Sequence, residues 1–181
     1  MDQPSDLDLV RSTRRGETET FGLLVNRYQQ KVYNVCYRML GERRDAEDLT
    51  QETFLRAYQR LGSFDVQRPF GPWIAKVAAN LCLNQLKKKV PEAMALDEER
   101  DSKKDDRASN PEEKHAVAAQ ANMIRSAILA LPPHYRAVVE LRHFQGMSYK
   151  DISAELAIPL SNVKSHLFRA RKQLAEELSG L

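Results

Sequence analysis

The sequence contains little cysteine, glycine or proline. Its 181 residues include 2 cysteines, 7 glycines and 8 prolines. Because glycine and proline are scarce and charges are dispersed through apolar periodic segments, collagen-like and wholly disordered chains are excluded. Cys36 and Cys82 lie far apart without a CxxC pair, which argues against a disulfide scaffold or a zinc site and fits a reducing cytosol. A chain of this length forms one moderate domain or two small ones, and a large multidomain enzyme is excluded.

The sequence also lacks a long apolar run. No segment approaches the roughly eighteen apolar residues that a membrane span needs, and residues 1–15 alternate acids with bases. We therefore expect a cytoplasmic protein with no direct membrane insertion and no export signal.

The net charge of +3 is unevenly distributed. Residues 1–90 carry 15 basic and 11 acidic side chains, residues 91–116 carry 5 and 9, and residues 117–181 carry 8 and 5. Two basic segments joined by an acidic one suggest a polyanionic partner that is contacted at two places.

Apolar residues recur every three or four positions through most of the chain. Helices are predicted at about 6–15, 21–41, 45–61, 70–89, 118–131, 133–141, 148–156 and 161–174. No useful period-two alternation occurs, so the predicted fold is all-α. Residues 91–116 cannot bury enough apolar surface to offset their ordering entropy. They are expected to form a flexible acidic linker between two small helical domains, 1–90 and 117–181.

Residues 146–174 have the pattern of a helix-turn-helix motif. Ser148 and Asp151 make a capping-box-like start, and a short segment from Ala157 to Leu160 separates the first helix from a second that we expect Ser161 to cap. The apolar residues of the second helix share one face: Val163, Leu167, Ala170 and Leu174.

The opposite face of this second helix suits a DNA major groove. It carries no acid, and arginine, asparagine and serine can contact base edges while lysine holds phosphates. The predicted DNA-binding residues are Ser161, Asn162, Lys164, Ser165, His166, Arg169, Arg171 and Lys172. The alternative is an ordinary solvated basic helix. His166 is expected at the surface or on a phosphate rather than as a metal ligand.

Acidic residues are concentrated between Asp45 and Tyr58. Asp45, Asp48 and Glu52 share a helix face, with Gln51 beside them. Paired carboxylates can hold a metal or perform acid–base chemistry, but this half of the chain has no histidine and no adjoining glycine-rich loop. Acids at a helix start also simply oppose the helix dipole. A third interpretation is a face that binds a basic partner.

A basic strip with aromatic neighbours is predicted on the helix of residues 70–89. The strip comprises Lys76, Asn80, Asn84, Lys87 and Lys88, and its aromatic neighbours are Phe64, Phe70 and Trp73. Unpaired bases can stack on aromatic faces while lysine and asparagine follow the backbone, so the strip suits single-stranded DNA. The alternative is that Trp73 and Phe70 fill the core.

Together, the two halves resemble a bacterial RNA polymerase sigma factor of the extracytoplasmic-function (ECF) group. The segment from Asp45 to Tyr58 is similar to the core-polymerase-binding helix of the family. The segment from Phe70 to Leu81 resembles the part that opens and reads the −10 element, and residues 131–174 resemble the −35-reading domain. The resemblance covers nearly the whole chain, and the ordered trio of motifs around an acidic linker is highly specific.

The resemblance implies a role for each part. Residues 1–90 would be sigma region 2, residues 117–181 sigma region 4, and the −35 duplex would bind the second helix of the helix-turn-helix. Core polymerase would bind Asp45, Asp48, Leu49, Gln51, Glu52 and Phe54. The loop from Gly62 to Gly71 would capture a splayed base of the single-stranded −10 element beside the basic strip. The resemblance further implies an anti-sigma factor, and no enzymatic activity, metal or cofactor.

The sequence departs from the family pattern at four positions. Ala157 stands where glycine is frequent, His166 stands where arginine is frequent, and Pro69 and Pro72 are not typical of the base-capturing loop. We expect Ala157 to alter the turn geometry slightly and the two prolines to shift the −10 preference. The usual phosphate or base contact does not carry over directly from the resemblance to His166.

Two rival functions account for less of the sequence. A helix-turn-helix repressor or response regulator that binds duplex DNA alone explains only the C-terminal half. A metal-dependent nuclease needs ligand spacing among its histidines, a glycine-rich phosphate loop or a nucleophile–base pair, and none is recognisable.

Overall fold

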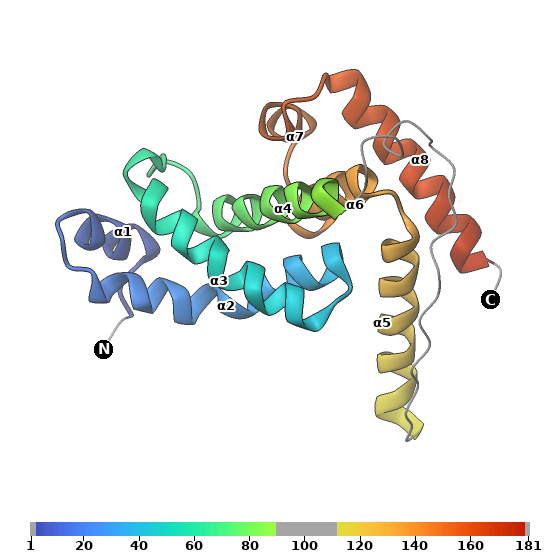
Figure 1. Cartoon of the computed structure of the whole chain (residues 1–181), viewed down its shortest axis with the longest axis horizontal. Helices are drawn as coiled ribbons and strands as arrows, with labels where there is room; N and C mark the ends of the chain where they lie inside the picture. Colours follow the sequence, from blue (N-terminus) through green and yellow to red (C-terminus); the bar gives the residue numbers. More distant parts are fainter. Residues whose placement is uncertain (1–2, 90–111, 180–181) are drawn as a thin grey trace.

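Helices make up all the regular structure in the computed structural model, which describes the backbone of residues 3–89 and 112–179 and the side chains of residues 3–88 and 119–179. In chain order they are α1 (Asp6–Arg14), α2 (Glu19–Leu40), α3 (Arg43–Arg60), the 3-10 turn η1 (Leu61–Ser63), α4 (Phe70–Lys89), α5 (Glu112–Ala130), α6 (Pro133–Val139), the π-helical turn η3 (Glu140–Phe144), α7 (Tyr149–Leu156) and α8 (Leu160–Ser179) (Figure 1). The predicted all-α fold is confirmed.

Most of the predicted linker of residues 91–116 lies outside the described residues, which omit residues 90–111. Its last part was predicted wrongly, because α5 already begins at Glu112. The first residues of α5 include glutamate, lysine and alanine, which favour a helix without forming an apolar stripe. Apolar periodicity alone therefore could not detect this start.

The N-terminal core is built around α2, which packs against α1, α3 and α4. Its apolar stripe is buried as predicted, with Leu24, Val32 and Val35 fully inaccessible. Gly41 ends the helix at φ +77°, a left-handed conformation that glycine adopts without steric cost. A Cβ at Gly41 would lie 2.9 Å from Leu129 Cδ1, so close packing against α5 also requires glycine there.

Both cysteines lie inside this core as free thiols. Cys36 on α2 and Cys82 on α4 are fully buried. The hydrogen bond to Cys36 and burial raise the pKa of the Cys82 thiol. A protonated buried thiol is a poor nucleophile and a poor metal ligand, so Cys82 acts in packing.

The C-terminal core consists of α5, α6 and α8, with α7 packed against α8. The predicted stripe of α8 is confirmed, because Val163, Leu167 and Ala170 are buried. Ser148 caps α7 as predicted, its Oγ accepting a hydrogen bond from the Asp151 backbone N–H at 3.1 Å. The predicted cap at Ser161 is wrong, since α8 begins at Leu160 and Ser161 therefore lies within its first turn.

The turn between α7 and α8 depends on a strained alanine. Ala157 ends α7 at φ +52° and is the one non-glycine residue with positive φ in the described part of the chain. Left-handed backbone costs an L-residue with a Cβ roughly 1–2 kcal/mol. The expectation that Ala157 alters the turn geometry is not supported by this backbone, which retains the glycine-type conformation at an energetic cost.

Replacing Ala157 with glycine is therefore expected to stabilise the C-terminal helices. The strain relieved exceeds the extra chain entropy of glycine, so we expect a gain of about 0.5–1 kcal/mol. Urea denaturation followed by circular dichroism measures it. Ala154→Gly, in the middle of α7, is the control and should destabilise by about 1 kcal/mol. A loss of stability in Ala157→Gly would contradict the strain argument.

The two helical groups pack against each other. α4 contacts α6 and η3, and α2 contacts α5, α6 and η3. Arg38 on α2 binds the carboxylate of Glu140 through Nε at 2.7 Å and Nη2 at 2.9 Å. Arg136 donates to the Met39 carbonyl; burial lowers the pKa of Arg136 to about 10, so its guanidinium stays charged at neutral pH. Charged hydrogen bonds thus join the two halves.

Candidate nucleic-acid interface

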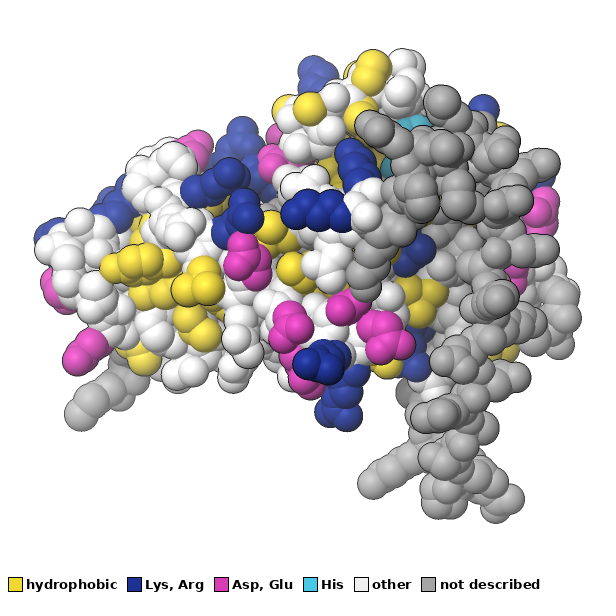
Figure 2. Space-filling view, viewed as in Figure 1, with side chains coloured by type: hydrophobic (Ala, Val, Ile, Leu, Met, Phe, Trp, Pro, Cys, Tyr) yellow, Lys and Arg dark blue, Asp and Glu magenta, His cyan; other side chains and the backbone are white. Residues whose placement is uncertain are grey.

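An acidic face runs along the outer side of α3. Asp48 and Gln51 are exposed, and Asp45 and Glu52 are half-buried beside them. Figure 2 shows acidic side chains gathered where Figure 1 places the N-terminal half of α3. Glu52 accepts a hydrogen bond from Arg56 Nε at 2.7 Å, one turn further along the helix. The face therefore presents acidic side chains to solvent, one of which, Glu52, is already paired with Arg56.

Two residues predicted for this face point into the core instead. Leu49 is 8% exposed and Phe54 is 7% exposed. Both belong to the apolar side of the helix and to the buried core, where the Phe54 ring contacts that of Phe21 on α2. The structure therefore does not support a direct partner contact for either. Exposed apolar side chains do occur on the same helix at Leu55 and Tyr58, which are 62% and 43% exposed. Both residues fall outside the buried stripe. Their spacing in the sequence could have indicated that they are exposed.

The basic strip of α4 is present, and its two ends differ in exposure. Asn84, Lys87 and Lys88 are exposed, whereas Lys76 and Asn80 are half-buried. Figure 2 shows lysine and arginine side chains gathered where Figure 1 places α4 and the loop before it. The strip and loop thus form a positively charged surface that can follow a nucleic-acid backbone.

The aromatic residues beside the strip form a packed cluster. The ring centroid of Phe64 lies 5.6 Å from that of Phe70 and 4.9 Å from that of Trp73, and the Phe70 and Trp73 centroids are 5.4 Å apart. Phe64 is 5% exposed and Phe70 is 2% exposed, whereas Trp73 is half-buried. The alternative that Trp73 and Phe70 fill the core therefore holds for Phe70 and not for Trp73, and Phe64, predicted as a DNA contact, is in the core as well. Of the three, only Trp73 retains substantial accessible surface for a base.

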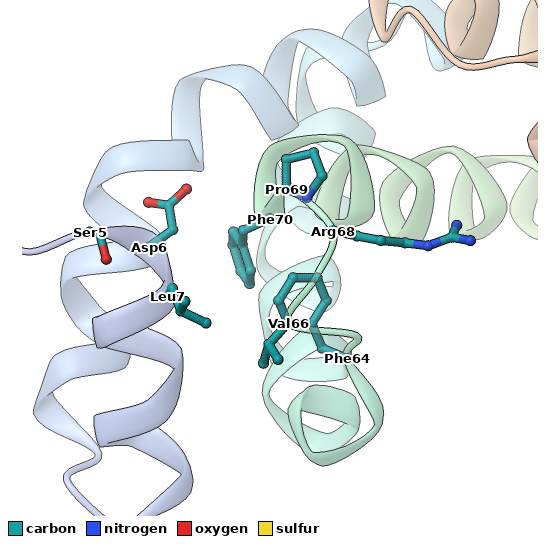
Figure 3. Close-up of a pocket in the computed structure, with 8 residues that line it drawn as sticks. All are labelled: Ser5, Asp6, Leu7, Phe64, Val66, Arg68, Pro69 and Phe70. Carbon is teal, nitrogen blue, oxygen red and sulfur yellow. The ribbon is translucent and has the colours of Figure 1, made fainter.

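Two hollows flank the loop between Gly62 and Gly71. The first, of about 230 Å³, lies between this loop and the start of α1 and is lined by Ser5, Asp6, Leu7, Phe64, Val66, Arg68, Pro69 and Phe70 (Figure 3). The second, of about 320 Å³, lies between the loop and α4 and is lined by Ser63, Phe64, Asp65, Arg68, Trp73 and Lys76. The second hollow combines an aromatic wall with two cationic side chains.

The outward face of α8 presents the predicted donors. One of them, Ser165, is half-buried, and the exposed ones are Ser161, Asn162, Lys164, Arg169, Arg171 and Lys172. Arg169 also reaches the Tyr135 hydroxyl at 3.3 Å. Phe168 was missed, although it is 70% exposed on the same helix and can contact a thymine methyl group. Its position between the buried Leu167 and exposed Arg169 could have indicated this.

His166 is held against α6 rather than projecting outward. Its ring centroid lies 5.2 Å from that of Tyr135 and 4.8 Å from that of His134. It is half-buried. The expected phosphate contact at this position is therefore not supported, and the ring acts in packing between α6 and α8.

Among the described residues, no three histidine, cysteine, aspartate or glutamate side chains lie close enough to hold a metal ion. Within the same ranges, none of the helices combines the length and apolar character required to cross a bilayer.

Comparison with known families identifies both halves. Residues 24–91 match the model for sigma-70 region 2, and residues 121–174 match that for sigma-70 region 4. A solved structure described as the sigma factor RpoE in complex with the anti-sigma factor NepR, from Bartonella quintana, shares the fold. Its TM-score is 0.66 at 23% identity, covering 88% of this chain and 96% of that chain.

Curated relatives are similar over the full length. The chain is 33% identical to the ECF RNA polymerase sigma factor SigW of Bacillus subtilis, covering 95% of this chain and 96% of that protein. It is 31% identical to the RNA polymerase sigma-H factor of Pseudomonas aeruginosa, covering 99% of this chain and 96% of that protein. With region 2 carrying the strip on α4 and region 4 carrying the helix-turn-helix, the chain belongs to the ECF family of RNA polymerase sigma factors and directs promoter-specific initiation of transcription.

Proposed function

We propose a division of labour in which α3 docks on core polymerase, α4 and its preceding loop hold the melted −10 strand, and α8 reads the −35 duplex. The observation that carries this proposal is the presence of two separate basic surfaces on one chain, one beside aromatic residues and one on a helix-turn-helix. Aromatic and basic groups together suit unpaired bases, whereas the exposed helix suits an intact major groove.

Capture of an unpaired base is proposed for the hollow lined by Trp73 and Lys76. Unstacking a base costs a few kcal/mol, and stacking returns about 1–3 kcal/mol. Trp73 supplies an accessible aromatic surface, and Lys76 and Arg68 supply charge for the flanking phosphates. Phe64 and Phe70 support this surface from within the core. Binding free energy alone thus stabilises the opened strand.

The proposed role is one of binding, without enzymatic chemistry. Core polymerase performs the synthesis, and the chain would act where polymerase and chromosome are, in the cytoplasm. An anti-sigma factor is a further proposed partner, because the solved structure of the same fold from Bartonella quintana is a complex of a sigma factor with the anti-sigma factor NepR.

In vitro transcription tests the proposed function. Purified core polymerase, this chain and a fragmented genomic library are incubated together, and the 5′ ends of the transcripts are sequenced. We expect start sites that share one −10 and one −35 sequence and that vanish without the chain. Start sites that do not change when the chain is omitted would contradict the proposal.

Glu52→Lys is expected to weaken core association at least tenfold, because a cation on the acidic face repels a basic partner surface. The side chain is half-buried at the surface, so the fold should change little. Fluorescence anisotropy with labelled chain and titrated core polymerase measures the affinity. Glu177→Lys, an exposed residue on α8, gives the same charge change as a control. If Glu52→Lys and Glu177→Lys bound core polymerase with equal affinity, α3 would not be part of the docking surface.

A further inference from the structure

An arginine of α1 holds the loop that precedes α4. Arg14 donates to the Leu61 carbonyl through Nε at 3.0 Å and through Nη2 at 2.7 Å, and Nη2 also donates to the Phe64 carbonyl. Leu61 begins η1 and Phe64 directly follows it, so one planar guanidinium bridges both ends of this turn. Hydrogen bonds from a charged donor are stronger than those between neutral groups. Arg14 thus ties the first part of the loop to α1.

The other hydrogen bonds of this loop are local. Among the described residues, those of residues 61–69 join neighbours in the sequence, as where the backbone N–H groups of Gln67 and Arg68 each donate to Asp65 at 3.0 Å. Local bonds shape a turn but do not fix its position against the rest of the domain. Arg14 therefore provides the hydrogen bonds that connect this loop to another helix of region 2.

α1 is itself fixed to α2, against which it packs. Asp6 at the start of α1 accepts a hydrogen bond from the Tyr28 hydroxyl and pairs with Arg27, both on α2. Burial and the hydrogen bond to Asp6 raise the pKa of Tyr28 to about 12, so the hydroxyl stays protonated and keeps donating at neutral pH. The helix is therefore a firm support from which Arg14 can hold the loop.

The segment held by Arg14 forms a wall of the hollow proposed to receive a base. Ser63 and Phe64 line that hollow together with Trp73, and the ring centroids of Phe64 and Trp73 are 4.9 Å apart. Phe64 also lines the hollow on the other side of the loop, where Figure 3 shows Leu7 of α1 pointing toward the loop. A displacement of the loop would therefore change the shape of the base-binding hollow.

The two hollows give the loop room to move in either direction. They measure about 230 Å³ on the α1 side and about 320 Å³ on the α4 side. A segment that becomes ordered only on binding loses conformational entropy at that moment, whereas a segment already held in the bound shape does not. A bridge from one guanidinium to two carbonyls selects a single position of the loop before DNA arrives.

We propose that Arg14 is a positioning residue for −10 capture, acting through the carbonyls of Leu61 and Phe64 to hold the loop in the shape that receives an unpaired base. The inference rests on the proposed function of the hollow lined by Trp73 and Lys76. Because Arg14 acts through the loop, its contribution to affinity depends on a base entering the hollow. A direct contact of Arg14 with a phosphate would contribute with or without that base.

Arg14→Ala tests this inference in the full-length protein bound to core polymerase. Arg11→Ala removes the same charge from an exposed position of α1 and is the matched control. Anisotropy of a labelled single-stranded −10 oligonucleotide, with its sequence taken from the mapped start sites, reports affinity. A second oligonucleotide carries an abasic site at the captured position, which is found by scanning the strand with the wild-type holoenzyme.

We expect Arg14→Ala to bind the intact strand roughly five- to tenfold more weakly than wild type and the abasic strand within about twofold of wild type. Arg11→Ala should match wild type on both strands. Equal losses of affinity for the intact and abasic strands in Arg14→Ala would overturn the inference, and so would equal losses in the two variants.

Hydrogen–deuterium exchange reports on the loop itself, without DNA. Amide exchange follows local opening, so residues 61–69 should exchange about tenfold faster in Arg14→Ala than in wild type or Arg11→Ala. Wild-type exchange in α2 would show that the domain is folded. Unchanged exchange in the loop, or faster exchange throughout α2 as well, would overturn the inference. If the wild-type holoenzyme bound the intact and abasic strands equally, the proposed base capture would be wrong instead, and exchange would still report whether Arg14 holds the loop.

Discussion

Arg169→Ala is expected to lower −35-dependent transcription about 10- to 100-fold, since a base-reading arginine contributes roughly 1–3 kcal/mol. Arg169 lies on the exposed side of α8, where a guanidinium fork can reach the edge of a guanine. Run-off transcription from one promoter with an intact or scrambled −35 element measures the effect. Core affinity should be unchanged, because α8 is separate from the acidic face of α3.

Arg169→Lys separates base reading from phosphate binding. Lysine keeps the charge but lacks the planar fork, so a base-reading arginine is not replaced by it. We expect Arg169→Lys to resemble the alanine variant on the intact −35 element and to show little further loss on the scrambled one. Full recovery by lysine would assign Arg169 to a phosphate, and equal losses of transcription and core affinity would exclude a groove-reading role.

The helices could be predicted from the sequence because their signals are local. The spacing of Leu24, Val32 and Val35 identifies α2, and Gly41 identifies its end. In the same way Ser148 marks the start of α7. The buried stripe of α8 follows from the same periodicity. These signals do not depend on distant parts of the chain, so the helices could be predicted without knowledge of the tertiary structure.

The wrong predictions concern side chains whose position depends on packing between helices. A phenylalanine in a loop before a basic helix is equally consistent with a base platform and a core residue, and only contacts with other helices place Phe64 in the core. The contact of Glu155 with Lys76 joins residues far apart in sequence, and each alone looks like an ordinary surface charge. His166 was misplaced because its packing partners, Tyr135 and His134, belong to another helix.

Phe70→Ala is expected to destabilise region 2 by about 3–5 kcal/mol, the usual cost of deleting a buried aromatic ring. Besides its contacts with Phe64 and Trp73, the ring centroid lies 5.3 Å from that of Tyr28, so truncation removes packing on several sides. Small domains are stable by only about 5–15 kcal/mol, so this is a large part of the total. Urea denaturation followed by the fluorescence of Trp73, the one tryptophan of the chain, reports on this core directly.

Phe168→Ala supplies the matched control, since it removes the same ring from a site that is 70% exposed. We expect its stability to change by no more than about 0.5 kcal/mol. The comparison decides between the two roles considered for Phe70. If Phe70→Ala kept wild-type stability and lost affinity only for the single-stranded −10 oligonucleotide, the ring would be a base platform. A large loss of stability, with Phe168→Ala unaffected, assigns Phe70 to the core and leaves Trp73 as the aromatic surface on which a base can stack.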